Sequence, residues 1–291
     1  MTQRIATAAS HIPPIGAVTG WAACRLHGAA FHDGLAPDGR TRLPVPIAVG
    51  TRGWVRRHPS ATYSYAAIDM DCVHTIAGVP ATDPVRATYD AMRAATLLVD
   101  AVVELEKSVM AGIISLEEMA AYVQTKAGTQ GVRLIREAVP LASEFSRSPQ
   151  EVRTRFVAEQ VARVPRLLVN STAWTVDGLR IGEVDLADPT SGLVIEFNGA
   201  YHEDGPRRHA DAVRLERLRA VGAELLQVTT PQLGSHQSLA QTIVAARMRA
   251  LTTPGEQRRY RFVPRQPFLH QQLLARRALA GLNASLEDRC R

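Results

Sequence analysis

The sequence has few cysteines, and none of them form a ligand cluster. Cys24, Cys72 and Cys290 are scattered and include no C-x-x-C pair. Structural zinc sites need closely spaced Cys and His ligands, and disulfides are rare where the cell keeps thiols reduced. The cysteine pattern therefore argues against a zinc site and predicts a cytoplasmic protein.

Long apolar runs and the common nucleotide-binding motifs are also missing. No stretch reaches the ~20 apolar residues of a membrane span, and residues 1–5 are not followed by a signal-peptide core. The sequence contains no internal repeat, Walker loop, G-x-G-x-x-G or G-x-S-x-G. We therefore expect no membrane partner and no P-loop, Rossmann or serine-hydrolase chemistry.

What the chain does have is enough length and apolar content for two folded domains. It contains 291 residues, of which 46% are hydrophobic and 21% charged. These proportions are typical of globular proteins, and each half is long enough to bury a core. We place the domain boundary in the polar stretch 142–147, just before a helix-capping pattern.

Two short apolar stretches, Ile181–Asp188 and Gly192–Gly199, face each other across a turn and carry acidic residues. If they form a hairpin, antiparallel pairing places Asp185 opposite Glu196. The same register puts Glu183 opposite Asn198 and leaves Val184, Leu186, Ile195 and Phe197 on the other face. The hairpin is then predicted to have one apolar face and one acidic face.

The acidic face predicts a bound cation. Directly opposed like charges destabilise a sheet unless a positive charge lies between them. Two carboxylates with an amide suit Mg²⁺ or Mn²⁺ better than Zn²⁺. The alternative is an edge hairpin whose acidic face is simply solvated, and Glu183 is better explained in that way.

The elements around the hairpin follow a definite order. Arg207, Asp211 and Arg214 share one face of a helix predicted from Pro206 to Ala220. The predicted order is helix, three strands, helix, strand and a last helix, at 148–163, 166–176, 181–188, 192–199, 206–220, 223–228 and 238–250.

This order and its motifs resemble the PD-(D/E)XK nuclease superfamily, in the branch similar to very-short-patch-repair endonucleases. The matching motifs are Val184-Asp185-Leu186, Ile195-Glu196-Phe197-Asn198-Gly199 with His202, Asp211-x-x-Arg214-x-x-x-Leu218-x-x-x-Gly222, and Leu225-Leu226-Gln227-Val228-Thr229. The resemblance implies an α/β fold with a restriction-endonuclease-like mixed sheet flanked by helices.

The resemblance also implies roles for individual residues. Asp185 and Glu196 would be the metal ligands, with Asn198 and His202 completing the site, and Arg214 or Arg208 would hold the scissile phosphate. The branch commonly has Asp where this chain has Asn198, and the wider superfamily usually has Lys there. The site would therefore carry one negative charge fewer, and a cation acting on the nucleophile would come from Arg or His.

Two of the candidate residues also have a structural explanation. Ser148-Pro149-Gln150-Glu151 is a complete capping-box pattern, so Glu151 is either a catalytic residue or a helix cap. Arg214 could simply pair with Asp211 at i, i+3 on a solvated helix face. Both interpretations remain open from the sequence.

Positive charge is concentrated at the C-terminal end of the chain. Residues 251–291 contain eight arginines and three acids, so 8 − 3 = +5 of the net charge of +6 lies there. Arginines alternating with Tyr260 and Phe262 suit phosphate contact and base stacking. We expect DNA contacts from Arg207, Arg208, Arg258, Arg259 and Arg261. A solvated tail is the alternative, and 268–282 has apolar residues at helical spacing, which predicts a helix packed on the nuclease-like domain or a partner.

The N-terminal half is predicted to be an α+β domain. We expect strands near 44–49, 62–68 and 72–76 and helices near 18–28, 84–94, 96–109, 115–126 and 129–138. Thr19 is predicted to cap the first of these helices, and Ser115-x-x-Glu118 is a capping-box pattern. The phrases VTGWAACRLHGA and GVPATDPVRATYDAMRAA resemble AbiEi-type abortive-infection antitoxins. That family often begins with a winged helix-turn-helix, which this sequence does not show, so a transcription-factor role is disfavoured.

The sequence thus predicts an AbiEi-like domain over 1–147, a nuclease-like domain over 148–250 and an Arg-rich tail with a helix over 251–291. The leading hypothesis is a Mg²⁺-dependent (or Mn²⁺-dependent) DNA endonuclease. The alternative is a non-catalytic DNA- or protein-binding regulator that keeps the nuclease fold. A homodimer would supply the two sites that double-strand cleavage ordinarily needs.

Overall fold

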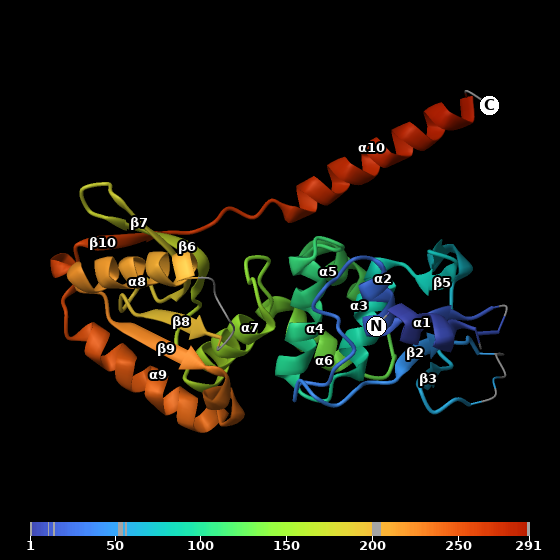
Figure 1. The fold of residues 1–291 in the computed structure, drawn as a ribbon, viewed down its shortest axis with the longest axis horizontal. Helices are drawn as coiled ribbons and strands as arrows, with labels where there is room; N and C mark the ends of the chain where they lie inside the picture. Colours follow the sequence, from blue (N-terminus) through green and yellow to red (C-terminus); the bar gives the residue numbers. More distant parts are fainter. Residues whose placement is uncertain are drawn as a thin grey trace. The chain divides into compact units, whose positions relative to one another are not determined.

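The structure, a computed structural model, describes residues 2–10, 12–13, 15–51, 55, 57–199 and 205–289. The chain forms two compact units (Figure 1). Unit 1 comprises Met1–Glu144 with Pro267–Arg291, and unit 2 comprises Phe145–Gln266. Within the described residues each unit holds one five-stranded mixed sheet, so the expected mixed α/β class is confirmed. Among the described residues, no helix has the length and apolar character needed to span a membrane.

Unit 1 combines a small sheet with a group of helices. Its strands are β1 (Ala17–Val18), β2 (Val45–Ala48), β3 (Ala61–Ser64), β4 (Val73–Ile76) and β5 (Val79–Thr82), in the order β3-β2-β1-β5-β4. Its helices are α1 (Thr2–Ala9), α2 (Gly20–Leu26), α3 (Pro84–Ala94), α4 (Leu98–Met110), α5 (Leu116–Gln124), α6 (Val132–Ala138) and α10 (Leu269–Arg289). The short elements α1, β1 and β5 lacked a sequence pattern strong enough to predict them.

Local capping residues set the helix starts of unit 1. Asp83 accepts the backbone N–H of Arg86 and Pro84 occupies the first helical position of α3. The predicted capping box at the start of α5 forms in full between Ser115 and Glu118. Thr19 occupies the N-cap position of α2, but its side chain does not cap the helix. Its hydroxyl instead donates to Asp90 Oδ2 at 2.7 Å.

The last helix, α10, belongs to unit 1. The carboxylate of Glu144 accepts the backbone N–H groups of Phe268 and Leu269 at 3.1 and 3.3 Å, which caps its first turn. His270 Nδ1 lies 2.8 Å from the hydroxyl of Ser115, at the start of α5. The amphipathic segment was expected on the nuclease-like domain or a partner, and these contacts instead join it to the N-terminal unit.

Unit 2 has the element order that the sequence predicts up to its last helix, followed by a strand at 260–263 where a tail was expected. Its elements are α7 (Pro149–Phe156), a π-helical turn (Val157–Val161), β6 (Leu168–Thr175), β7 (Arg180–Ala187), β8 (Val194–Asn198), α8 (Gly205–Ala220), β9 (Leu225–Thr229), α9 (His236–Leu251) and β10 (Tyr260–Val263). The sheet order is β10-β6-β7-β8-β9, and only β8 and β9 run parallel. Helix α8 makes the crossover between these two parallel strands.

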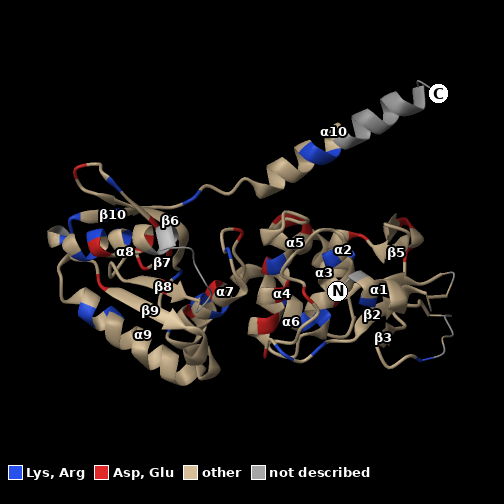
Figure 2. Ribbon diagram, in the orientation of Figure 1, with Lys and Arg blue, Asp and Glu red and all other residues tan. Residues whose placement is uncertain are grey.

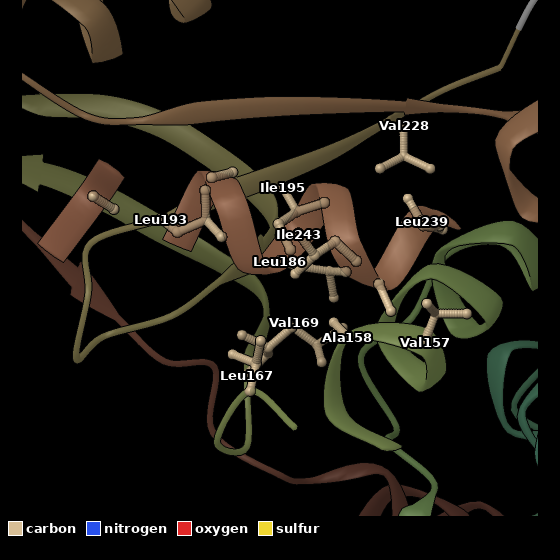
Figure 3. Close-up of a cluster of buried hydrophobic side chains, with 14 residues drawn as sticks. Val157, Ala158, Leu167, Val169, Leu186, Leu193, Ile195, Val228, Leu239 and Ile243 are labelled. Atoms are coloured by element: carbon tan, nitrogen blue, oxygen red, sulfur yellow. The ribbon is translucent and has the colours of Figure 1, made fainter. Parts of the chain in front are cut away.

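Both faces of this sheet are covered. One face packs on α9 and the π-helical turn through a core that includes Leu186, Ile195 and Ile243 (Figure 3). The opposite face packs on α8 through a second core that includes Val194 and Leu218. Figure 1 shows α8 and α9 on opposite sides of the strands. The part of the predicted acidic face around Glu196 is therefore covered by α8, whereas Glu183 is half-buried and Asn198 is exposed.

One residue of the hairpin packs differently from the prediction. Val184 was expected beside Leu186, yet it packs in the α8-side core with Ala187. Asn170, which stands in β6 between the partners of Leu186 and Val184, has φ +47°, so the strand is irregular opposite Asp185, as at a β-bulge. A bulge re-aims neighbouring side chains, and strict alternation from a single register cannot anticipate it.

Candidate functional site

The two predicted metal ligands lie next to each other on neighbouring strands. Strands β7 and β8 pair Leu186 with Ile195, and this register continued by one residue sets Asp185 opposite Glu196. Oδ2 of Asp185 accepts the backbone N–H of Phe197 at 2.9 Å, so its carboxylate is turned toward β8. Glu196 is only 6% exposed. The sequence-predicted juxtaposition of the two acids is present.

The electrostatics of this pair favour one negative charge rather than two. Burial, then the negative charges of Glu196 and Glu151, raise the pKa of Asp185 to about 7. Burial also raises the pKa of Glu196, although the bonded Arg214 opposes the rise. A cation placed between the two carboxylates would reverse both effects, because it stabilises the ionised forms.

Arg214 of α8 supplies positive charge to Glu196. Its Nη1 and Nη2 donate to Oε1 and Oε2 of Glu196 at 2.7 and 3.0 Å, a bidentate ion pair. The guanidinium also contacts Asp211 Oδ1 at 3.2 Å and donates to the carbonyl oxygen of Glu183 at 2.8 Å. Burial lowers the pKa of Arg214, but the bond to Glu196 outweighs it and raises the pKa above its ordinary value. Arg214 is therefore charged and lies at the site, as expected, although it holds a carboxylate.

A glycine makes room for this arginine. The stem of Arg214 crosses β7 at Gly182, where an added Cβ would lie 2.7 Å from Cδ of the arginine. Gly182 also has φ +155°, a conformation that other residues rarely adopt. The sequence offered no signal for this requirement, since a glycine within a strand can equally mark a bulge or a tight bend.

Glu151 lies close enough to influence Asp185, but its carboxylate is fully engaged in local structure. Its backbone N–H donates to Ser148 Oγ at 3.2 Å, as the capping pattern predicts. Its Oε2 accepts the backbone N–H of Arg147 at 2.9 Å, one residue earlier than a capping box requires. The same oxygen accepts the Asn170 amide at 2.8 Å. Asn170, buried and with φ +47°, is a neighbour that no sequence pattern identified.

The remaining predicted site residues are either exposed or outside the described part of the chain. Asn198 ends β8 and is exposed. His202 lies outside the described residues. Arg207 and Arg208 belong to the first turns of α8, and their side chains are outside the described part of the chain.

The residue types at the site fit Mg²⁺ or Mn²⁺. Asp185 and Glu196 offer hard oxygen ligands, and Mg²⁺ often binds through one or two carboxylates while keeping several waters. Within the described residues, no group of three or more His, Cys, Asp or Glu side chains is arranged to hold a metal. Asp185 and Glu196 are thus two candidate ligands, and one of them is paired with Arg214.

The Arg-rich segment after α9 forms part of the sheet. Residues 260–263 make β10, which pairs antiparallel with β6. Tyr260 is buried, and its hydroxyl donates to the carbonyl of Gly192 at 2.8 Å, so its ring is not available for base stacking. Arg258 donates to the carbonyl of Thr190 at 2.7 Å. Arg259 and Arg261 are exposed, and Figure 2 shows further basic positions on α8 and α9 of the same unit.

Comparisons of the chain with protein-family models, with curated proteins and with solved structures gave no match.

Proposed function

We propose that unit 2 is a Mg²⁺- or Mn²⁺-dependent DNA endonuclease of restriction-endonuclease-like architecture. The observation that supports this most is the half-buried Asp185 beside the buried Glu196, whose mutual repulsion a divalent cation would relieve. The element order helix, three strands, helix, strand agrees with the resemblance to the PD-(D/E)XK superfamily.

In this proposal the residues of unit 2 have separate roles. A bound divalent cation supplies Lewis-acid stabilisation and an acidified water for attack on the phosphodiester. Asp185 and Glu196 bind and orient the cation. Arg214 offers a guanidinium that can hold a phosphate, and the exposed Arg259 and Arg261 contact the DNA backbone.

A cleavage assay tests the proposal. Purified full-length protein is incubated with supercoiled plasmid and with labelled duplex in Mg²⁺, Mn²⁺ or EDTA. We expect metal-dependent nicking that is lost in Asp185→Asn and in Glu196→Gln. Glu216→Gln is the matched control, because Glu216 is an exposed acid on α8. Cleavage that persists in both site variants would contradict the proposed ligands.

One observation favours the non-catalytic alternative. The ion pair between Arg214 and Glu196 already neutralises a charge that a metal would otherwise neutralise. Asn198 also removes the acid or lysine expected at its position. A DNA- or protein-binding regulator with this fold should show salt-dependent gel shifts and no nicking in any metal. The same set of samples distinguishes the two functions.

A further inference from the structure

Both carboxylate oxygens of Glu196 are occupied by the same guanidinium. Nη1 and Nη2 of Arg214 donate to Oε1 and Oε2 of Glu196 at 2.7 and 3.0 Å. The Glu196 side chain is 8% exposed. A cation that binds Glu196 needs at least one of these oxygens. Arg214 and a metal ion therefore cannot hold Glu196 in this geometry at the same time.

A second acid, Asp211, is positioned to pair with the guanidinium of Arg214 when a metal ion binds Glu196. Asp211 lies one turn earlier on α8, and its Oδ1 is 3.4 Å from Nε and 3.2 Å from Nη2 of Arg214. Its side chain is 47% exposed, whereas that of Arg214 is 19% exposed. A shift from Glu196 toward Asp211 therefore moves the guanidinium from the covered sheet face toward solvent, where a phosphate could reach it.

We propose that Arg214 and the divalent cation compete for Glu196, and that Asp211 holds the displaced guanidinium ready for the phosphate. This inference rests on the proposed function, because it assigns the metal to Asp185 and Glu196. Without metal, the ion pair with Arg214 keeps the carboxylate neutralised. With metal, the exchange delivers a guanidinium to the place where the substrate phosphate must lie.

Gly182 provides a way to disturb the ion pair without removing its charge. A Cβ at this position would meet the arginine stem at Cδ and Cγ, 2.7 and 3.0 Å away. Gly182→Ala should therefore push the guanidinium off Glu196 while every charge of the site is kept. The net charge of the site would be the same in this variant, but direct competition for Glu196 would be weaker.

The test is calorimetric or EPR titration of full-length variants with Mn²⁺ alone. We expect Arg214→Gln to bind Mn²⁺ at least about tenfold more tightly than the unaltered chain, and Gly182→Ala to bind several-fold more tightly. Arg217→Gln removes an equal charge from an exposed position on the same helix and should change affinity less than about twofold. Thermal unfolding of each variant checks that it is folded.

A double-mutant cycle tests the role of Asp211. Asp211→Asn should weaken Mn²⁺ binding in the unaltered chain, because Arg214 then has fewer alternatives to Glu196. In the Arg214→Gln background the same change should have much less effect. Equal effects in both backgrounds would show that Asp211 acts only through its own charge and would overturn its assignment as the alternative partner.

The possible failures can be told apart. If the unaltered chain binds Mn²⁺ and Glu196→Gln does not, but neither Arg214→Gln nor Gly182→Ala binds more tightly, the metal site stands and the competition is wrong. If no folded variant binds Mn²⁺, the proposed function loses its metal site and the competition falls with it. As a direct readout, the ¹⁵N signal of Arg214 Nε should shift on addition of Mg²⁺, and an unchanged signal in a chain saturated with metal would also overturn the exchange.

Discussion

The carboxylate of Asp185 accepts the backbone N–H of Phe197 at 2.9 Å, directly beside Glu196 on the neighbouring strand. This bond fixes one oxygen of Asp185 against β8 and holds two acids together in a covered part of the sheet. Hydrogen bonding to the ionised form lowers the pKa of Asp185, yet burial and the charge of Glu196 outweigh it. Close approach of two acids costs folding free energy once both are ionised.

Stability should therefore fall with rising pH because of Asp185. Its pKa is raised to about 7 in the folded chain, whereas an unfolded Asp titrates near ~3.9. The folded state holds the proton more tightly, so this contribution is complete below about pH 4 and is lost as pH rises through about 7. Urea unfolding from pH 4.5 to 8 should show Asp185→Asn gaining stability relative to the unaltered chain, by on the order of a few kcal/mol at pH 8. Parallel curves for the two proteins would contradict the shifted pKa.

Two variants can distinguish a capping role of Glu151 from a catalytic role of its carboxylate. Ser148→Ala removes the hydroxyl that accepts the Glu151 backbone N–H and should cost about 1 kcal/mol of unfolding free energy. Glu151→Gln also disturbs the bonds to Arg147 and Asn170 and should cost as much or more. If Glu151 acts only as a cap, both variants keep cleavage activity when folded. A cleavage rate that falls at least tenfold in folded Glu151→Gln alone would assign it to the site.

The sequence predicted well what local chemistry determines. The capping box of Ser115 and Glu118 depends on residues three apart, and the pairing of Asp185 with Glu196 follows from strand alternation and one turn. Contacts made across long separations could not be predicted in the same way. Arg214 reaches Glu196 only because Gly182 leaves room for its stem, and that requirement appears only once α8 is docked on β7.

The Arg-rich segment after α9 also has a sequence pattern that fits two different structures. Alternating Arg, Tyr and Phe suits nucleic-acid contact and also suits an edge strand with one buried side. Pairing of β10 with β6 decides the orientation, since Tyr260 faces the core and Arg261 faces outward. Composition alone cannot distinguish these arrangements.

DNA binding should consequently depend on the arginine and not on the tyrosine of β10. Arg261→Gln should weaken DNA binding and lower the slope of log affinity against log salt by about 1, as expected for one lost phosphate contact. Tyr260→Phe loses the hydrogen bond to the Gly192 carbonyl and should cost about 1 kcal/mol of stability with unchanged DNA affinity. Fluorescence anisotropy at several salt concentrations measures both. Loss of affinity in folded Tyr260→Phe would contradict this prediction, because it would show that the tyrosine hydroxyl contributes to DNA binding.

The stability of the turn before β8 should depend on an ion pair whose carboxylate is buried. Asp188 is fully buried and accepts Arg247 Nε of α9 at 2.8 Å, and it also accepts the Ser191 hydroxyl at 2.6 Å and the Thr190 backbone N–H at 2.9 Å. Burial works to raise the pKa of Asp188, but these hydrogen bonds and the charge of Arg247 outweigh it and lower the pKa. Its stabilising contribution is therefore present at pH values above the ordinary pKa of Asp, and it is lost as the pH falls through the lowered pKa of the folded state.

Removing either partner of this ion pair should lower the free energy of unfolding. Arg247→Ala leaves the carboxylate buried without its cation and should cost about 3 kcal/mol. Arg249→Ala is the matched control, because Arg249 lies two residues away on α9 and pairs with Glu224 at 2.6 Å in a more exposed position. That variant should cost less than about 1 kcal/mol. Chemical denaturation at pH 7 compares them, and equal losses would show that burial does not strengthen the Asp188 pair. At pH 3 the difference between the two variants should shrink, because Asp188 is then closer to its protonated form.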